Sequence, residues 1–377
     1  MRIGGKDYQS IWLDEGDETV VRVIDQRKLP YYLETKELRS AEEVYDAIRD
    51  MTIRGAPLIG VAGAFGMYLA TLEINSRTNI REHLKNAARY LISCRPTAVN
   101  LSWAVNRVLD RLLTAQHEDS LSGLALRTAV EIREYEIENC RLIGMYGVPL
   151  IEELSHAKNG NPVNILTHCN AGWLACVDYG TALAPVYLAH DKGIPLHVWV
   201  DETRPLNQGA KLTAWELGSH GVPYTLITDN AGGHLMQTGK VDLVITGGDR
   251  ATLQGDVANK IGTYLKALAA SDNSVPFYCA LPSTSVDFTI RDGRAEIIIE
   301  EREEEEVTTV SGLAGGTIQT VRICPENAAA SNPGFDITPA RLITGFITEK
   351  GVCKATEEDI KRLFSDKLIN DGRGSKV

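Results

Sequence analysis

One cysteine, Cys169, lies in the polar run Thr167–Gly172, directly after a short apolar segment. A thiol that precedes a glycine and a predicted helix could act as an acid or a base, because helix N-terminal amides lower the pKa of a thiol. The alternative is a buried, inert cysteine, which is the ordinary role of this residue type. The polar neighbours His168 and Asn170 leave both interpretations open.

One aspartate, Asp249, follows an apolar segment and two glycines, Gly247 and Gly248. Burial of its carboxyl group in such a tight setting would raise the pKa. A carboxyl group with a raised pKa can donate a proton near neutral pH. The alternative roles at this position are a helix cap or a salt bridge to Arg250.

Two arginines could hold an anion. Arg54 precedes Gly55–Pro57, and Arg95 precedes Pro96, so both lie next to residues that end or begin an element. A guanidinium group pairs with two phosphate oxygens at once, which makes such positions suitable phosphate clamps. Solvated surface arginines are the alternative interpretation.

The segment Asp256–Lys260 resembles the beginning of a helix over 257–270, with Asp256 as its cap. Asn259 and Lys260 would then lie in the first turn, where anions bind favourably. A lysine is unusual at that position, which favours a ligand role over a solvated one. The apolar positions of this predicted helix are Val257, Ile261, Leu265 and Leu268.

The second half of the chain alternates short apolar segments with helical patterns, which predicts a parallel, doubly wound α/β sheet. Polar clusters follow all five apolar segments. Because parallel strands end at one edge of a sheet, these clusters should converge on a single site there. The predicted strands are Asn164–Thr167, Leu196–Val200, Tyr224–Thr228, Val241–Thr246 and Pro276–Leu281.

The first half has two strand-like segments before residue 35 and is helical after Glu37. We therefore predict a small β element with a helical domain over residues 1–150, and a Rossmann-like α/β domain over residues 160–377. The boundary is expected in Gly147–Asn161, which contains Pro149 and Gly160. The apolar stretch Ala56–Leu72 is expected to be a buried helix rather than a membrane span.

The composition excludes several classes of protein. The 377 residues carry a net charge of −11, which argues against binding to nucleic acid or to a membrane surface. The seven cysteines form no C-x-x-C pair, and the histidines His168, His197 and His234 have no metal-ligand spacing, so no metal is expected. No G-x-G-x-x-G motif indicates a dinucleotide cofactor. The acidic N-terminus predicts no signal peptide and hence a cytoplasmic protein.

Several sequence motifs, spread over nearly the whole chain, together resemble those of one family. The chain is similar to the methylthioribose-1-phosphate isomerases, which share a superfamily with the regulatory subunits of the eukaryotic translation-initiation guanine-nucleotide exchange factor. The matching phrases are Ile53–Pro57, Arg95–Asn100, Thr167–Gly172, Asp201–Pro205, Gln208–Ala210, Gly255–Thr263 and Asn332–Pro339.

The resemblance implies an aldose–ketose isomerase that acts on 5-methylthioribose 1-phosphate in methionine salvage. It implies Cys169 and Asp249 as the catalytic pair, without a metal or a cofactor, in a homodimer with a Rossmann-like C-terminal domain. It also implies a set of residues that hold the sugar phosphate, namely Arg54, Gly55, Ala56, Arg95, Gln208, Asn259 and Lys260.

Departures from the family pattern leave alternatives open. Gly247-Gly248 stands where the family often has Gly-Ala, and Gln254 stands where it often has Asn. The substrate could therefore be another pentose 1-phosphate, such as 5-deoxyribose 1-phosphate, ribose 1-phosphate or ribose 1,5-bisphosphate. A non-catalytic regulatory subunit is the other alternative, but such a subunit has no reason to keep both Cys169 and Asp249.

Overall fold

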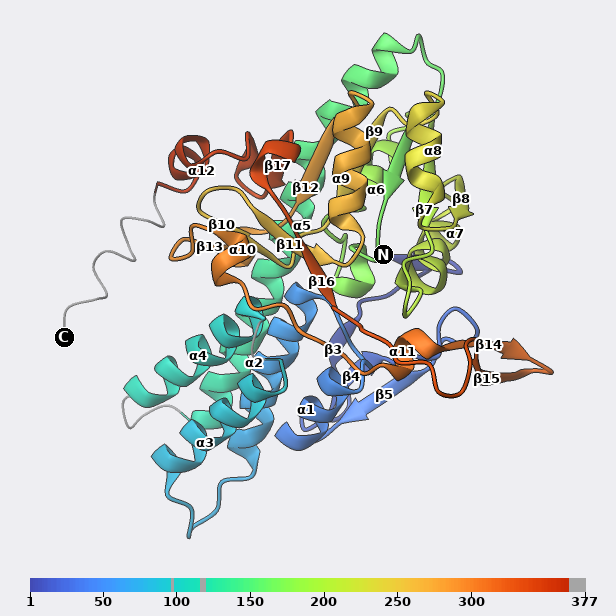
Figure 1. Ribbon diagram of the computed structural model, residues 1–377. Coiled ribbons are helices and arrows are strands. Elements are labelled where there is room, and N and C mark those ends of the chain that lie inside the picture. Colours follow the sequence, from blue (N-terminus) through green and yellow to red (C-terminus); the bar gives the residue numbers. More distant parts are fainter. Residues whose placement is uncertain (96–97, 116–119, 366–377) are drawn as a thin grey trace. The chain divides into compact units, whose positions relative to one another are not determined.

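The computed structural model describes residues 1–95, 98–115 and 120–365 (Figure 1). By their internal contacts, the residues form two compact units. The first unit comprises Met1–Arg141 and Gly172–Gly180, and the second comprises Leu142–Ala171 and Thr181–Val377. The long helix α5 (Leu121–Ala157) runs through the predicted boundary region. The division into an N-terminal domain over residues 1–150 and a C-terminal domain over residues 160–377 stays a prediction.

The first unit joins a small antiparallel sheet to a group of helices, as predicted. Its sheet has the order β3-β4-β5, and the short strands β1 and β2 form a separate pair. The elements are β1 (Arg2–Ile3), β2 (Lys6–Asp7), β3 (Ile11–Leu13), β4 (Val21–Ile24), β5 (Thr35–Leu38), α1 (Ala41–Arg49), α2 (Ala56–Leu72), α3 (Ile80–Ser93), α4 (Val99–Thr114) and the first part of α5.

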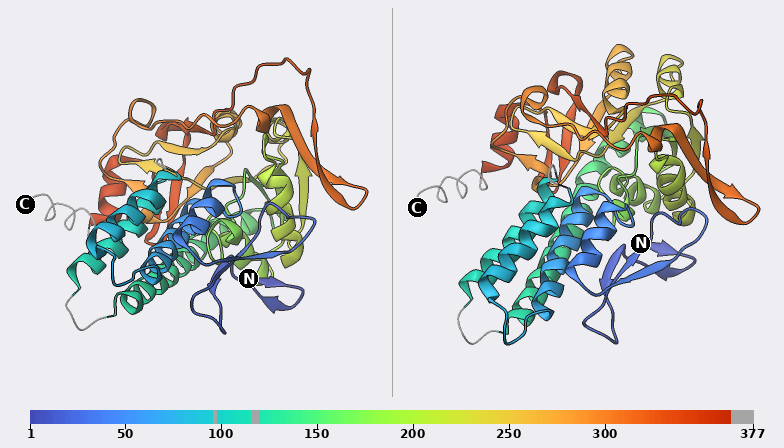
Figure 2. Two further views of the ribbon diagram at one scale, coloured as in Figure 1. Left: turned by 90° about the horizontal axis from the view of Figure 1, so that it is seen from below. Right: turned by 60° about the horizontal axis from the view of Figure 1, so that its bottom comes forward.

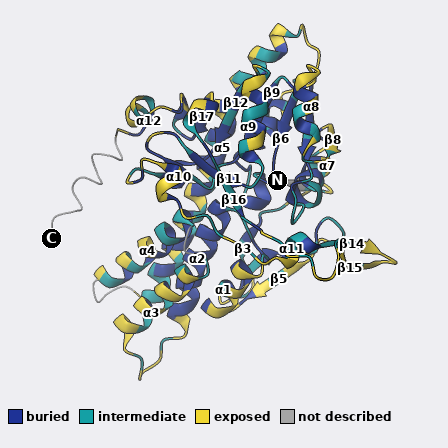
Figure 3. Ribbon diagram, viewed as in Figure 1, coloured by how far each residue is buried: buried dark blue, intermediate teal, exposed yellow. Residues whose placement is uncertain are grey.

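Helix α2 is the central helix of this unit. All its residues except Leu72 are buried, as expected for a helix that is apolar on every side (Figure 3). Glycines allow its neighbours to approach closely, since a Cβ atom on Gly60 would lie 2.9 Å from the Asn100 carbonyl oxygen of α4. The stretch predicted as a buried helix therefore forms the core of the first unit.

The second unit is built on a seven-stranded sheet of order β18-β17-β12-β9-β6-β7-β8. All strands are parallel except β18, which pairs antiparallel to β17. This confirms the predicted fold class. The strands are β6 (Val163–Thr167), β7 (Leu196–Asp201), β8 (Tyr224–Ile227), β9 (Leu243–Thr246), β12 (Phe277–Ala280), β17 (Gly345–Thr348) and β18 (Gly351–Cys353).

The first strand of this sheet in chain order is β6, which lies in its interior. The chain then proceeds through β7 to β8 at one edge. It then returns to the other side of β6 and adds β9, β12 and β17 outward. The order of the parallel strands therefore reverses between β6 and β9. In doubly wound sheets, ligands bind beyond the carboxyl ends of the strands at this switch point.

Helices cover both faces of the sheet (Figure 1). Helices α8 and α9 lie side by side on one face, where a Cβ atom on Gly232 would lie 2.9 Å from Leu166 of β6. Helix α6 and the second part of α5 pack together, with Gly147 against Pro185. The helices are α6 (Ala184–Asp191), α7 (Ala214–His220), α8 (Ala231–Gln237) and α9 (Thr263–Asp272).

A second sheet of order β13-β10-β11-β16 was not predicted. The helix expected over 257–270 is wrong in its first part, because Val257–Lys260 is strand β11, paired with β10 and with the distant β16. Helix α9 begins only after Gly262, whose φ is +103°. Leu265, expected on the apolar face, is 60% exposed. The other strands are β10 (Arg250–Thr252), β13 (Val286–Asp287) and β16 (Phe335–Thr338).

A β-hairpin projects from the second unit, as both views in Figure 2 show. It consists of β14 (Thr309–Ala314) and β15 (Thr317–Arg322) and follows two short helices, α10 (Gly293–Glu296) and α11 (Glu305–Thr308). Residues Glu300–Glu306, before the hairpin, are acidic except for Arg302. Arg302 forms ion pairs with Glu300 and Glu306. Helix α12 (Glu357–Leu363) is the last described helix. Among the described helices, none is both long and apolar enough to cross a membrane.

Candidate active site

Cys169 and Asp249 follow the two strands that flank the switch point. Cys169 lies two residues after β6, and Asp249 lies three residues after β9. These strands are parallel neighbours, so both residues lie at the same edge of the sheet. The two loops are in direct contact, since a Cβ atom on Gly247 would lie 2.9 Å from the Cβ of Ala171. The structure therefore brings the predicted catalytic pair to one edge.

The loop that contains Cys169 differs from the prediction. No α-helix begins directly after it, because only a 3₁₀ turn, Trp173–Ala175, precedes α6. The helix that we predicted directly after this cysteine is therefore wrong. Instead, Cys169 has a left-handed backbone, with φ of +65°, and is 8% exposed.

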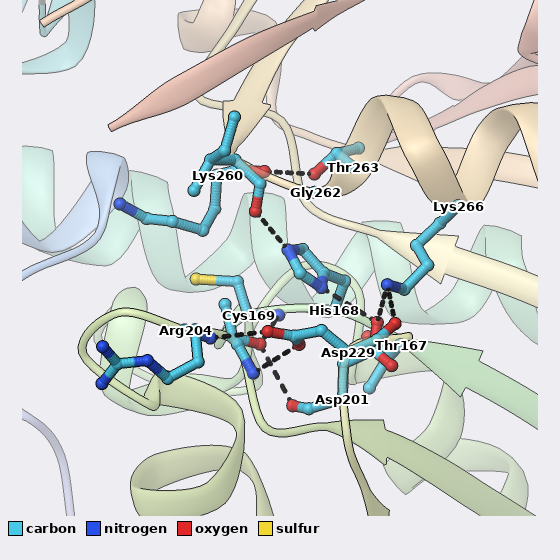
Figure 4. Close-up of polar contacts among 12 residues, drawn as sticks. Thr167, His168, Cys169, Asp201, Arg204, Asp229, Lys260, Gly262, Thr263 and Lys266 are labelled. Carbon is cyan, nitrogen blue, oxygen red and sulfur yellow. Dashed lines mark hydrogen bonds and ion pairs between the residues drawn. The ribbon is translucent and has the colours of Figure 1, made fainter. Parts of the chain in front are cut away.

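His168, the residue before Cys169, is held between two hydrogen-bond acceptors (Figure 4). Its Nδ1 lies 3.0 Å from Oδ2 of Asp201, and its Nε2 lies 2.8 Å from the Ile261 carbonyl oxygen. A carbonyl oxygen can only accept, and so can an ionised carboxylate. The Nε2 group therefore donates to the Ile261 carbonyl, and His168 links the end of β6 to the turn after β11.

Lys266 of α9 pairs with the same carboxylate. Its Nζ lies 3.1 Å from Oδ2 of Asp201 and also donates to the main-chain carbonyl of Asp229. Both Lys266 and Asp201 are buried. The buried charge of Asp201 is thus paired with the ammonium group of Lys266, and such pairing is the condition for keeping a carboxylate buried.

Among the described residues, His168, Asp201 and Asp229 have the spacing of a metal site, with ligand atoms within 4.8 Å of one another. These groups are already used in hydrogen bonds. The carboxylate oxygens of Asp229 accept from the N–H groups of Thr203 and Arg204, and the two ring nitrogens of His168 face Asp201 and the Ile261 carbonyl. The donor set therefore does not fit a metal ion.

Asn259 and Lys260 lie in β11, beside Asp249, whose N–H donates to the Ala258 carbonyl over 3.0 Å. The Lys260 ammonium lies 4.9 Å from the centre of the Phe335 ring. These two residues are thus placed by a β-hairpin and not by a helix. The turn after them is held by Asp336, which accepts from the N–H groups of Gly262 and Tyr264. Burial raises the pKa of Asp336, although these hydrogen bonds oppose the shift.

Gln208 follows β7, the other neighbour of β6. Its side chain is buried, and its Oε1 has no hydrogen-bond partner among the described residues. An unpaired buried amide oxygen is costly, so natural proteins keep few of them. This oxygen is suited to accept a hydrogen bond from a ligand hydroxyl.

The remaining predicted residues belong to the first unit. Arg54, Gly55 and Ala56 lie at the N-terminus of α2, where Gly55 has φ of +101°. Its Cβ would lie 2.3 Å from the Ala175 carbonyl oxygen, so only glycine fits. Arg95 follows α3, with its Nη1 3.8 Å from the Met51 sulfur. Pro96 and Thr97, part of the same motif, lie outside the described residues.

Comparison with known proteins identifies the family. The family model described as the initiation factor 2 subunit family matches residues 52–355. A methylthioribose-1-phosphate isomerase from Desulfatibacillum aliphaticivorans is 56% identical over 98% of this chain and 100% of its own length. Another from Sinorhizobium medicae is 55% identical over 97% of this chain and 100% of its own length. The chain belongs to the methylthioribose-1-phosphate isomerase family.

Solved structures agree with this family assignment. The crystal structure of a 5-methylthioribose 1-phosphate isomerase from Pyrococcus horikoshii has a TM-score of 0.81 and 38% identity, and covers 96% of this chain and 97% of its own. A structure from A. fulgidus, titled as translation initiation factor eIF-2B, subunit delta, has a TM-score of 0.78 and 40% identity, and covers 95% and 100%. The methylthioribose-1-phosphate isomerase fold is thus shared with proteins that carry other names.

The sequence did not single out four residues that surround Cys169 in this methylthioribose-1-phosphate isomerase family member. Thr203 and Asp229 lie in polar clusters at strand ends, so their position in the sequence was a usable signal. Thr213 and Lys266 lie within helical turns and gave no such signal. Their contacts to Cys169 and Asp201 depend on the tertiary structure alone.

Proposed function

We propose that this protein converts 5-methylthioribose 1-phosphate to 5-methylthioribulose 1-phosphate, an aldose–ketose isomerisation in methionine salvage. The observation that carries this proposal is the position of Cys169 and Asp249 on neighbouring loops at the switch point of the sheet. The names of relatives 52–56% identical to this chain support the choice of substrate.

Asp249 is the proposed acid for ring opening. A sugar that carries a phosphate on C1 is not a free hemiacetal, so its ring oxygen must gain a proton as the bond between C1 and the ring oxygen breaks. A carboxyl group beside that oxygen supplies the proton, and general acid catalysis of this kind contributes roughly 10²–10⁴ in rate. Asp249 lies partly buried between β9 and β10, within a short reach of the edge where the sugar would bind.

Cys169 is the proposed residue for the second step, in which the hydrogen on C2 reaches C1. Its sulfur either carries this hydrogen as a proton through an enediol-like intermediate or polarises the site while a hydride shifts directly. His168, the preceding residue, is held by Asp201 and the Ile261 carbonyl at the same end of β6.

The proposed substrate-holding residues divide by chemistry. Arg54 and Arg95 pair with the phosphate oxygens, and the main chain at Gly55 and Ala56 offers N–H groups at the start of α2. In the second unit, the unpaired Oε1 of Gln208 accepts from a sugar hydroxyl. Asn259 and Lys260 act from β11, beside Asp249.

The experiment that tests this function is phosphorus and proton NMR of the protein with 5-methylthioribose 1-phosphate in D₂O, without added metal. We expect the ketose 1-phosphate to form. Deuterium at C1 would identify proton transfer through an exchanging Cys169, and retained protium would favour a hydride shift. Turnover of only ribose 1-phosphate or another pentose 1-phosphate would replace the substrate, and no turnover at all would favour a regulatory subunit.

The two glycines before Asp249 give a matched pair of variants. A Cβ on Gly247 would lie 2.9 Å from the Cβ of Ala171, which moves only with its backbone, whereas one on Gly248 would lie 3.0 Å from methyl groups of Leu281 and Val257. Gly247→Ala should therefore push apart the loops that carry Cys169 and Asp249 and lower kcat/KM by roughly 10- to 100-fold. Gly248→Ala should remain within about threefold of the wild type in the same steady-state assay. Equal losses would contradict this account.

We also propose, from the family resemblance, that the protein is a cytoplasmic homodimer. Light scattering coupled to gel filtration measures the mass directly. A mass near twice the 41.3 kDa of the chain would support the dimer, and a mass equal to it would exclude the dimer.

A further inference from the structure

We propose that Thr203 is a positioning residue for Cys169. Its hydroxyl group holds the backbone of the cysteine in the conformation from which the thiol acts, and Asp229 anchors Thr203 in turn. The proposal rests on the proposed function for its meaning in catalysis, but not for its geometry. It adds to the reaction two residues from the ends of β7 and β8 that were not among the predicted site residues.

The Cys169 backbone is in a conformation that it does not adopt freely. Its φ of +65° places it in the left-handed region, where a side chain with a Cβ is disfavoured. Such a conformation persists only where the surrounding structure enforces it, and it is found most often at functional sites. The direction of the Cys169 thiol therefore depends on whatever holds this backbone.

Two threonine hydroxyl groups hold the Cys169 peptide groups on both sides. The N–H of Cys169 donates to Oγ1 of Thr203 over 2.8 Å, and Oγ1 of Thr213 donates to the Cys169 carbonyl over 2.7 Å. The Thr203 hydroxyl donates in turn to the Asp201 carbonyl over 3.1 Å, so its hydrogen-bonding role is fixed. All four residues are buried, so water does not readily replace these contacts.

Thr203 is itself held in an unfavourable conformation. Its φ is +63°, which is rare for a β-branched residue. The Asp229 carboxylate holds it there, since Oδ1 accepts from the Thr203 N–H over 2.7 Å and Oδ2 from the Arg204 N–H over 2.8 Å. Asp229, Thr203 and Cys169 thus form a chain of contacts across the carboxyl ends of β8, β7 and β6.

This chain of contacts reaches Cys169 at its main-chain N–H. In Figure 4 the Cys169 sulfur points away from the Asp229 carboxylate and toward the side of the loop on which Lys260 extends. The hydrogen bond that links Thr203 to Cys169 is thus made by the main chain of the cysteine. Loss of the Thr203 hydroxyl should alter where the sulfur points, and thereby the rate of the chemical step, without removing a contact to the substrate.

The test compares Thr203→Val, which keeps the shape and removes the hydroxyl, with Thr203→Ser, which keeps the hydroxyl. The matched control is Thr348→Val. Thr348 is also fully buried, donates to the Gly351 carbonyl and accepts from the Lys350 N–H, but it is the last residue of β17. We expect Thr203→Val to lower kcat at least about tenfold with KM within about threefold, because misplaced reacting groups slow the chemical step. Thr203→Ser and Thr348→Val should keep kcat within about threefold.

A second readout does not depend on turnover. The rate at which iodoacetamide alkylates Cys169, followed by mass spectrometry of its peptide, reports the environment of the thiol itself. We expect this rate to change at least about threefold in Thr203→Val and to be restored in Thr203→Ser. The proposal is overturned if the alkylation rate is unchanged in Thr203→Val, or if kcat falls equally in Thr203→Val and Thr348→Val. If the wild type does not isomerise the sugar phosphate, the proposed function is wrong. The alkylation rates still decide whether Thr203 positions Cys169.

Discussion

Cys169→Ser and Asp249→Asn are each expected to lower kcat for 5-methylthioribose 1-phosphate at least about a hundredfold, while KM changes little. The serine hydroxyl is a far weaker acid than the thiol, and the asparagine amide cannot donate the proton that ring opening needs. Because both residues would act on the reacting atoms rather than on the phosphate, the loss should fall on kcat. Steady-state kinetics of the purified variants measure both constants.

Cys279→Ser is the control for the cysteine. Cys279 lies within β12 of the same sheet, and burial raises the pKa of its thiol to about 12, so it stays neutral at physiological pH. We expect this variant to keep kcat within about threefold, because a neutral buried thiol is inert. Near-normal turnover in Cys169→Ser or in Asp249→Asn would remove that residue from the mechanism.

Lys266→Met is expected to destabilise the second unit by about 3–5 kcal/mol, which is the usual effect of removing one partner from a buried ion pair. Lys266 lies 3.1 Å from Oδ2 of the fully buried Asp201, so its removal takes the ammonium partner away from that carboxylate. Methionine has nearly the same length, so the loss should reflect the charge rather than a cavity. The midpoint of urea unfolding, followed by circular dichroism, measures the change.

The double variant Asp201→Asn with Lys266→Met separates charge from packing. If the buried carboxylate is the cause, neutralising it should make the double variant more stable than the sum of the single losses predicts. Simple additivity would show that Lys266 stabilises the unit by packing alone. A loss below about 1 kcal/mol in Lys266→Met would contradict the ion-pair account.

The parallel sheet was predictable because its strands are buried on both faces and read as continuous apolar segments. All four residues of β9 are buried, for example, and nearly all of β6. The polar residues after each strand then indicated the edge where the site lies. The fold class and the edge of the sheet thus follow from local patterns.

Contacts between residues far apart in the sequence explain what the sequence did not predict. Val257–Lys260 has apolar spacing compatible with a helix, but it pairs with Phe335–Thr338, about 75 residues further along the chain. Arg250 forms an ion pair with Asp287 of β13, 37 residues further along the chain. The left-handed backbone of Cys169 is fixed by Thr203 and Thr213, which no local pattern connects to it. Such contacts depend on the tertiary structure and cannot be predicted from the spacing of residues in the sequence.

Strand β8 is the edge of the main sheet, and its first three residues are exposed. Edge strands open locally at a lower free energy than the core of a protein. Asp229 lies two residues after β8, so fraying of this strand would release the anchor of Thr203 and, through it, the backbone of Cys169. On warming, activity should therefore decline together with hydrogen-exchange protection of β8, at temperatures where the central strands β6 and β9 are still fully protected.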